Sequence, residues 1–178
     1  MSETKVVTGK VRFSYAHVFV ATSISEDQDK KFSVSLLIPK KDKATIAKIE
    51  KAIKAALLEG KSSKFGGKIP NNYKNPLRDG DDERPDDENY EGMMFVNASS
   101  KRRPSVKDVD LNDIMDDEEF YSGCWGRASV NFYPFSVSGN KGVACGLNHV
   151  QKLEDGDKLG GSISSAEDDF GSADDDLM

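Results

Sequence analysis

Apolar and polar residues alternate along several stretches of this chain, and this pattern predicts a protein built mainly of β-strands. Residues 6–19 place Val11, Phe13 and Tyr15 on one side of a strand, with polar residues between them. Residues 31–38 repeat the alternation. Both stretches have the pattern of half-buried strands, and the polar residues between them predict a loop.

One stretch has a helical period instead. From Asp42 to Gly60, apolar residues recur every three or four positions, at Ile46, Ile49, Ile53 and Leu57. The lysines of this stretch fall on its other side, which predicts a solvated helix face. Asp42 is expected to cap the start of the helix, and Gly60 is expected to end it.

The middle of the chain is poor in apolar residues. Residues 60–92 are rich in Gly, Pro, Asn and Asp, which predicts a long excursion that is partly ordered at most. Residues 93–99 predict another strand. Residues 108–119 are acidic and predict mostly loop, with a helical turn around Leu111 to Met115.

The clearest strands come last. They are expected at 121–135 and 142–150, joined by a turn at 136–141. Strands that are interrupted by one helix and long loops indicate a small β-barrel or sandwich. We therefore expect a single folded domain at 1–153.

The net charge of −6 is distributed unevenly along the chain. Residues 154–178 carry nine acidic residues and one lysine (1 − 9 = −8), so residues 1–153 carry 24 − 22 = +2. Most acidic residues of this body lie in 79–91 and 108–119. The rest of the body is strongly basic, which predicts a surface that binds a polyanion.

The acidic end of the chain predicts a disordered tail at 154–178, because it is rich in Gly, Ser and Asp. A flexible polyanion can imitate nucleic acid, occupy a basic groove weakly and be displaced by the real ligand. The displaced tail could then meet other proteins; the alternative is a solubilising tail without a partner. The residues expected to meet a partner are Asp168, Asp169, Phe170, Asp174, Asp175, Asp176 and Leu177.

The strand at 121–135 carries the candidate chemistry. One face has the core residues Cys124, Ala128, Val130 and Phe132. The other face has, at roughly 7 Å steps, Trp125, Arg127, Asn131 and Tyr133. Basic residues expected to support this face are Lys10, Arg12, Lys101, Arg102 and Arg103. Rings that stack bases, with cations for phosphates, predict single-stranded nucleic acid as the ligand, unless the two rings cover a second small core.

Other functions have weaker support. Cys124 and Cys145 lack the spacing of a zinc site and are expected in the core, while His17 and His149 are expected on strands rather than as a catalytic pair. We expect no cofactor, no metal and no membrane partner. Because no signal peptide or long apolar run is present, we expect a cytoplasmic protein.

Two rival functions remain open at this stage. The carboxylates of 79–87 could bind Mg²⁺ in a nuclease, but they lie in a Pro- and Gly-rich loop without a general base or nucleophile nearby. A DNA mimic or assembly protein could use the acidic surface to block a DNA-binding partner. A mimic, however, has no need of the basic cluster at 101–103 or of Trp125.

Several phrases of this sequence resemble a known family. They are SVSLLIPK (33–40), NPLRDGD (75–81), FVNASSKRRPSV (95–106), YSGCWGRASVNFYPF (121–135), GNKGVACGLNHVQKLEDGDKLGG (139–161) and SSAEDDF (164–170). Together they are similar to the bacteriophage single-stranded DNA-binding protein family.

The resemblance implies a mainly β protein with one helix, folded as an OB-fold-like five-stranded barrel with elaborated loops. It also implies sequence-independent binding of single-stranded DNA in phage replication, recombination or repair, in the host-cell cytoplasm. The acidic tail would recruit replication or recombination proteins, although here Phe170 is followed by eight further residues. Pairing of 93–99 across a homodimer is left open.

Overall fold

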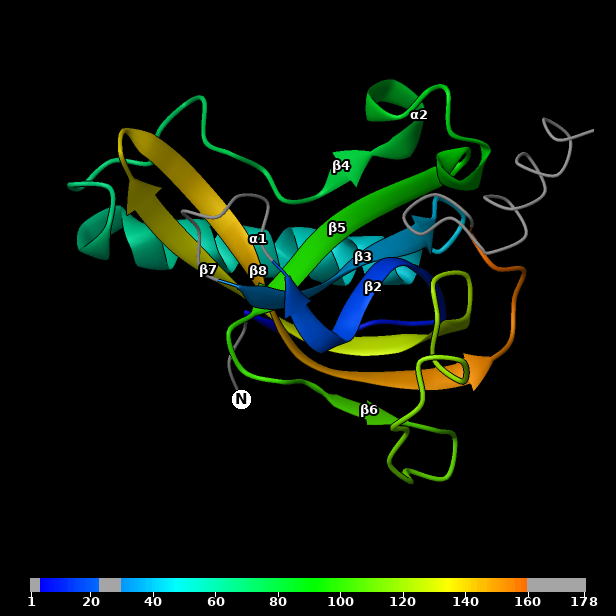
Figure 1. The fold of residues 1–178 in the computed structure, drawn as a ribbon. Coiled ribbons are helices and arrows are strands. Elements are labelled where there is room, and N and C mark those ends of the chain that lie inside the picture. Colours follow the sequence, from blue (N-terminus) through cyan, green and yellow to red (C-terminus); the bar gives the residue numbers. More distant parts are fainter. Residues whose placement is uncertain (1–3, 23–29, 160–178) are drawn as a thin grey trace, which may run out of the picture.

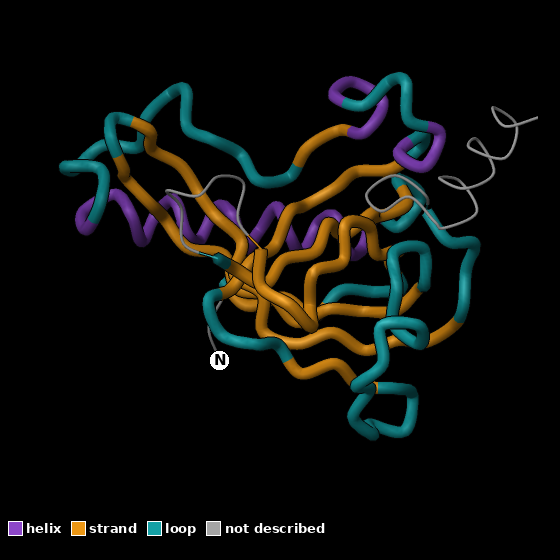
Figure 2. Tube along the Cα trace, in the orientation of Figure 1, coloured by secondary structure: helices purple, strands orange, loops and turns teal. Residues whose placement is uncertain are grey.

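The computed structural model describes residues 4–22 and 30–159. The chain forms a curved β-barrel with one long helix behind it (Figures 1 and 2). The helices are α1 (Lys43–Ser63), α2 (Gly80–Glu83) and the 3-10 turn η1 (Glu88–Tyr90). The strands are β1 (Lys5–Val7), β2 (Val11–Thr22), β3 (Lys31–Pro39), β4 (Arg78–Asp79), β5 (Met93–Ser100), β6 (Ser105–Lys107), β7 (Trp125–Val137) and β8 (Asn140–Glu154).

The barrel is a closed ring of five strands in the order β2, β3, β5, β8, β7 and back to β2. All neighbours in the ring are antiparallel except β5 and β8, which are parallel. This ring confirms the mainly β, OB-fold-like barrel with one main helix. The short strands β1 and β6 extend the sheet outside the ring.

The core fills the barrel and the space beneath α1. The helix contributes Ile49, Ile53 and Leu57 to it, as the periodicity predicts. Asp42 caps the helix, since its Oδ1 accepts a hydrogen bond from the backbone N–H of Thr45 at 3.2 Å. The lysine face is exposed.

The prediction that Gly60 ends the helix is wrong. The helix continues to Ser63, and Gly60 is buried within it. A methyl group at this position would lie 2.5 Å from Cβ of Pro134 and 2.7 Å from the ring of Phe65. The glycine therefore allows close packing of the helix on β7 rather than a turn.

The first predicted strand is divided. Residues 5–7 form β1, and β2 starts at Val11 after a bend. Tyr15 does not share the face of Val11 and Phe13. It has a positive φ of 49° at an irregularity of β2, and its side chain packs in the outer cluster around Leu37.

The helical turn predicted around Leu111 to Met115 is absent. Leu111 has a φ of 67°, which is incompatible with a right-handed helix. The preceding β6 was not predicted, and β7 begins at Trp125 rather than at residue 121.

The turn between β7 and β8 is confirmed. It is a two-residue connection through Ser138 and Gly139, both with positive φ, which suits the twist of a hairpin. The cysteines Cys124 and Cys145 are buried and free, and burial raises the pKa of both thiols.

The excursion 60–92 has more regular structure than predicted, since it includes β4, α2 and η1. The strand predicted at 93–99 is confirmed as β5, which is an inner strand of the sheet rather than an edge strand. It lies between β3 and β8, and β4 pairs with it near its start. In the described part of the chain, no helix is long and apolar enough to cross a membrane.

Residues beyond β8 still contact the barrel where they are described. The backbone N–H of Leu159 donates to the carbonyl of Ser122 at 2.9 Å, and the Leu159 side chain packs on the outer cluster around Leu37. The predicted partner-binding residues of the tail, from Asp168 to Leu177, lie outside the described residues.

Candidate nucleic-acid interface

A cleft forms where β5 and β8 diverge. The two strands pair only through Ala98 with Cys145 and through Ser99 with Gly146. Toward the β7–β8 hairpin they separate, and the gap is bridged by the segment 72–78, which lies above β5 in Figure 1.

Lys74 joins this segment to the hairpin. Its carbonyl accepts from the N–H of Val143 at 3.0 Å, and its N–H donates to the carbonyl of Lys141 at 2.9 Å. Gly142 is required here, because a methyl group would lie 2.5 Å from the carbonyl oxygen of Lys74. At the other end, Arg78 pairs with Phe95 of β5.

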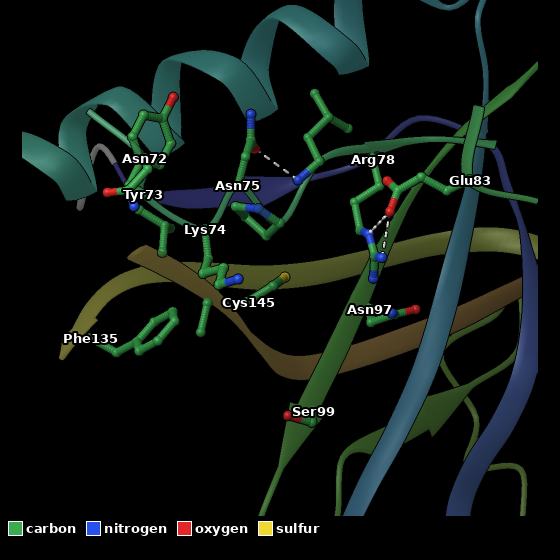
Figure 3. Close-up of a pocket in the computed structure, with 14 residues that line it drawn as sticks. Asn72, Tyr73, Lys74, Asn75, Arg78, Glu83, Asn97, Ser99, Phe135 and Cys145 are labelled. Atoms are coloured by element: carbon green, nitrogen blue, oxygen red, sulfur yellow. Dashed lines mark hydrogen bonds and ion pairs between the residues drawn. The ribbon is translucent and has the colours of Figure 1, made fainter. Parts of the chain in front are cut away.

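The resulting cleft has a volume of about 770 Å³. In Figure 3, the ring of Phe135 lies on the hairpin side, and Asn97 and Ser99 lie on β5 on the other side. Tyr73 and Lys74 come from the bridging segment. Tyr73 packs against the hydrophobic core, while the ring of Phe135, the cation Lys74 and small polar side chains line one open space.

Several polar groups of the cleft have no partner within the described chain. The ammonium group of Lys74, the amide of Asn97 and the hydroxyl of Ser99 make no hydrogen bond to described residues. They are available to a ligand.

Arg78 adds a second cation to the cleft. Its guanidinium lies over the ring of Phe95, with Cζ 5.3 Å from the ring centroid. Its Nε donates to Oε1 of Glu83 at 2.8 Å, and its Nη2 contacts the same oxygen. This pairing raises the pKa of Arg78, so the side chain stays charged.

Residues 78–83, which form β4 and α2, are here called the arm. Lys40 holds the arm on the barrel through two ion pairs. The ammonium of Lys40 lies 2.8 Å from Asp79 Oδ1 and 2.7 Å from Asp81 Oδ2. Asp81 also accepts from the N–H of Gly92 at 3.1 Å. The hydrogen bonds from Lys40 lower the pKa of both carboxyl groups, and those carboxylates raise the pKa of Lys40.

Three of the predicted site residues form a second surface, here called the tryptophan surface: Lys10, Arg12 and Trp125. Lys10 Nζ and Arg12 Cζ each lie 5.7 Å from the centroid of the Trp125 ring. Both cations also have other partners. Lys10 pairs with Glu154, and Arg12 donates to backbone carbonyls, that of Asp157 at 2.6 Å among them.

The remaining residues of the predicted β7 face are spread along the strand. Arg127 is exposed and donates to Oε1 of Gln151 at 2.6 Å. Asn131 is half-buried between β1 and β8 and accepts from Thr4 Oγ1 at 3.1 Å. Tyr133 is 42% exposed and lies beside Gly146, at the edge of the cleft. The structure thus separates Trp125 from Tyr133 and brings only Tyr133 near the cleft.

The basic residues Lys101, Arg102 and Arg103 lie on the connection from β5 to β6 and are exposed. Arg103 packs over the ring of Phe19, with Cζ 5.9 Å from its centroid. This basic cluster follows directly on the end of β5, the strand that floors the cleft.

Comparisons with known proteins identify the family. The family described as "Enterobacter phage Enc34, ssDNA-binding protein" matches residues 4–178. The chain belongs to the Enc34 single-stranded DNA-binding protein family. It is 35% identical over 171 residues to putative protein p50 of Acyrthosiphon pisum secondary endosymbiont phage 1, covering 92% of this chain and 91% of that protein.

Solved structures from phages share the architecture of this Enc34-family member. The single-stranded DNA-binding protein from bacteriophage Enc34 in complex with ssDNA has a TM-score of 0.76 and 26% identity, covering 89% of this chain and 91% of that one. The single-stranded DNA-binding protein gp2.5 of bacteriophage T7 has a TM-score of 0.61 at 15% identity, covering 89% and 90%. This second likeness shows the fold alone.

Family membership identifies this chain as a phage DNA-binding protein rather than an enzyme. Three of the carboxylates considered for a nuclease serve other contacts: Asp79 and Asp81 bind Lys40, and Glu83 binds Arg78. Across residues 4–22 and 30–159, no group of three or more His, Cys, Asp or Glu side chains is placed to hold a metal ion.

Sequence reasoning missed most of the cleft of this family member. Tyr73, Lys74 and Phe135 come from two segments that meet only through the pairing of Lys74 with Gly142. An available signal was the run NNYKNPLR at 71–78, which places a ring and two cations in an otherwise polar loop.

Proposed function

We propose that this protein binds single-stranded DNA without reading its sequence, and that the cleft over β5 holds the strand. The observation that carries this proposal is the meeting of one ring, Phe135, with two cations, Lys74 and Arg78, around one open space. Rings stack on any base, and cations contact the phosphates between bases.

The position of the cleft supports the same function. The cleft lies over β5, the third strand of the ring, and OB-folds bind oligonucleotides on the face of their second and third strands. A single strand suits the cleft because its bases are free to stack on side chains, whereas duplex bases already stack on each other. The Enc34 protein was solved in complex with ssDNA, which is consistent with this proposal.

The strand is proposed to continue from the cleft along the outer surface of the barrel. Tyr133 borders the cleft, and the cluster Lys101, Arg102 and Arg103 follows β5. The tryptophan surface would provide a further contact near the start of β5, since Met93 and Trp125 line the same hollow. On this path Arg127 and Asn131 are outlying contacts.

The acidic tail is proposed to compete with DNA for these cations and, once displaced, to recruit replication or recombination proteins. Its charge supports this role, because residues 160–178 contain six acidic residues and no basic residue. In a phage this would place the protein in DNA replication, recombination or repair in the host cytoplasm.

The function is tested by fluorescence anisotropy with a labelled poly-pyrimidine oligonucleotide, a mixed-sequence strand and a duplex. We expect similar affinity for the two single strands, weaker affinity for the duplex, and affinity that falls as salt rises. Absence of binding to either strand at low salt would overturn the proposal. A strong preference for one of the two sequences would overturn its sequence independence.

A further inference from the structure

One acidic side chain lies inside an otherwise basic cleft. Of the described residues that line it, Lys74 and Arg78 are basic and Glu83 alone is acidic, so the lining charge is 2 − 1 = +1. A carboxylate in a site for phosphates opposes binding.

Glu83 occupies the part of Arg78 that a phosphate would use. Its Oε1 accepts from both Nε and Nη2, and that edge of a guanidinium is one that binds phosphate oxygens in a bidentate manner. The side chains remain 44% and 36% exposed, so an incoming anion can reach the pair. Figure 3 shows the carboxylate and the guanidinium facing each other at the rim.

Both partners are held in place. Packing over Phe95 fixes the guanidinium of Arg78 against the barrel. Glu83 belongs to α2, and Lys40 holds this helix on the barrel through its ion pairs with Asp79 and Asp81. The carboxylate is therefore positioned by the fold rather than by a chance surface encounter.

We propose that Glu83 is an internal competitor for DNA phosphate. In the free protein it occupies the Nε–Nη2 edge of Arg78, and a phosphate of the strand displaces it on binding. The charge of Glu83 then sets the affinity of the cleft. This inference rests on the proposed function and names a regulator of that same site.

The test is Glu83→Gln, which keeps the shape of the side chain and removes its charge. Anisotropy with the poly-pyrimidine oligonucleotide should show roughly threefold tighter binding at low salt. The dependence of log affinity on log salt should change by less than about 0.7, the value of one phosphate contact on single-stranded DNA, because Arg78 reaches the phosphate in both proteins. The matched control is Asp82→Asn, which removes a charge from the same short helix at a residue that does not line the cleft.

A second comparison uses Arg78→Gln. In that background Glu83→Gln should no longer tighten binding, because the group that it releases is gone. Weaker binding by Glu83→Gln alone would show that Glu83 positions Arg78, and an equal gain in Asp82→Asn would show a general charge effect; either result overturns the inference. Unchanged affinity would also overturn it while leaving the function intact. Loss of DNA binding by the unmodified protein would instead overturn the proposed function.

Discussion

The cleft and the tryptophan surface both bring aromatic rings next to cations, but they differ in what those cations already bind. At the tryptophan surface, Lys10 pairs with Glu154, and Arg12 donates to two backbone carbonyls. In the cleft, the ammonium group of Lys74 has no partner among the described residues, and the guanidinium of Arg78 is paired with one carboxylate, that of Glu83.

This difference shows that an aromatic residue near cations is not sufficient to indicate a stacking platform. Trp125 is half-buried, and its ring lies so close to the backbone of Gly156 that a methyl group there would be 2.9 Å from Cδ1. Phe135 is also half-buried, but its ring lines the cleft beside the unpaired ammonium group of Lys74. The tryptophan surface is therefore partly a packing feature, and the cleft is better suited to exchange its contacts for those of a ligand.

The largest expected effect comes from removing both cleft cations, in Lys74→Gln with Arg78→Gln. Hydrogen bonds to charged groups contribute about 1.5–3 kcal/mol each, so two of them at the low end of this range give an expected loss of at least roughly 100-fold in affinity at low salt. The salt slope should fall by about 1.4, for two phosphates. Anisotropy across salt concentrations measures both. Lys48→Gln with Lys51→Gln on α1 is the charge-matched control, and an equal loss in that control would contradict the assignment of the cleft.

The next effect is that of Phe135→Ala. Loss of one stacking ring should weaken binding by about 1–3 kcal/mol with little change in the salt slope, because no charge is removed. Val137→Ala, further along the same hairpin, is the control for side-chain truncation. If Phe135→Ala leaves the affinity unchanged, the DNA strand does not bind in the cleft.

Trp125→Ala should affect DNA binding less than Phe135→Ala, by about 1 kcal/mol, at the low end of the range for stacking. It should also lower the melting temperature, since the ring packs between Lys10, Arg12 and Gly156. Calorimetry and anisotropy on the same preparation separate the two effects. A larger binding loss than that of Phe135→Ala, with the melting temperature unchanged, would reverse the ranking of the two regions.

Removal of residues 160–178 should tighten binding by about threefold at low salt and by less at high salt, because screening weakens the competition. Truncation after Leu159 keeps the contacts of the tryptophan surface intact. If the tail competes in the cleft, the gain should disappear in the Lys74→Gln, Arg78→Gln background. A gain that persists there would place the competition at the tryptophan surface instead, and no gain at any salt concentration would contradict the competition.

The smallest expected effect is that of low pH on the stability of the arm, which borders the cleft. The folded pKa values of Asp79 and Asp81 are lowered by Lys40, so their contribution to the stability of the arm is fully present above the ordinary pKa of about 3.9 and is lost as pH falls below it. Hydrogen exchange at the N–H of Gly92, which donates to Asp81, should lose protection in that range after correction for the intrinsic rate. Lys40→Gln should remove this pH dependence.

Much of the barrel was predictable because each of its elements is specified by a pattern of neighbouring residues. Alternation marked β3, β7 and β8, the helical period marked the buried face of α1, and Ser138–Gly139 lies within the predicted turn. Tyr15 was placed on the wrong face, because an irregularity in β2 reverses the side-chain direction. Gly60 was misread because the same residue suits a helix end and close packing.

The cleft was less predictable because it depends on contacts between distant segments. The sequence does not reveal that β5 and β8 separate before Ala98 and Cys145, toward the hairpin, or that Lys74 pairs with Gly142. Parity along β7 correctly separated the buried residues from the outward ones. It could not show that β7 spans the barrel, so that Trp125 and Tyr133 lie in different surroundings.

The five strands of the ring pair with one another without using the segment between α1 and β5. That segment supplies Tyr73, Lys74, Arg78 and Glu83, while the barrel supplies the floor and the hairpin. The same segment also contributes to the core, through the buried Phe65 and through Ile69 and Leu77, which pack against it. Substitution of the exposed Lys74 or Arg78 can therefore alter affinity for DNA during evolution or engineering, while the apolar residues of 64–79 continue to hold the segment on the barrel.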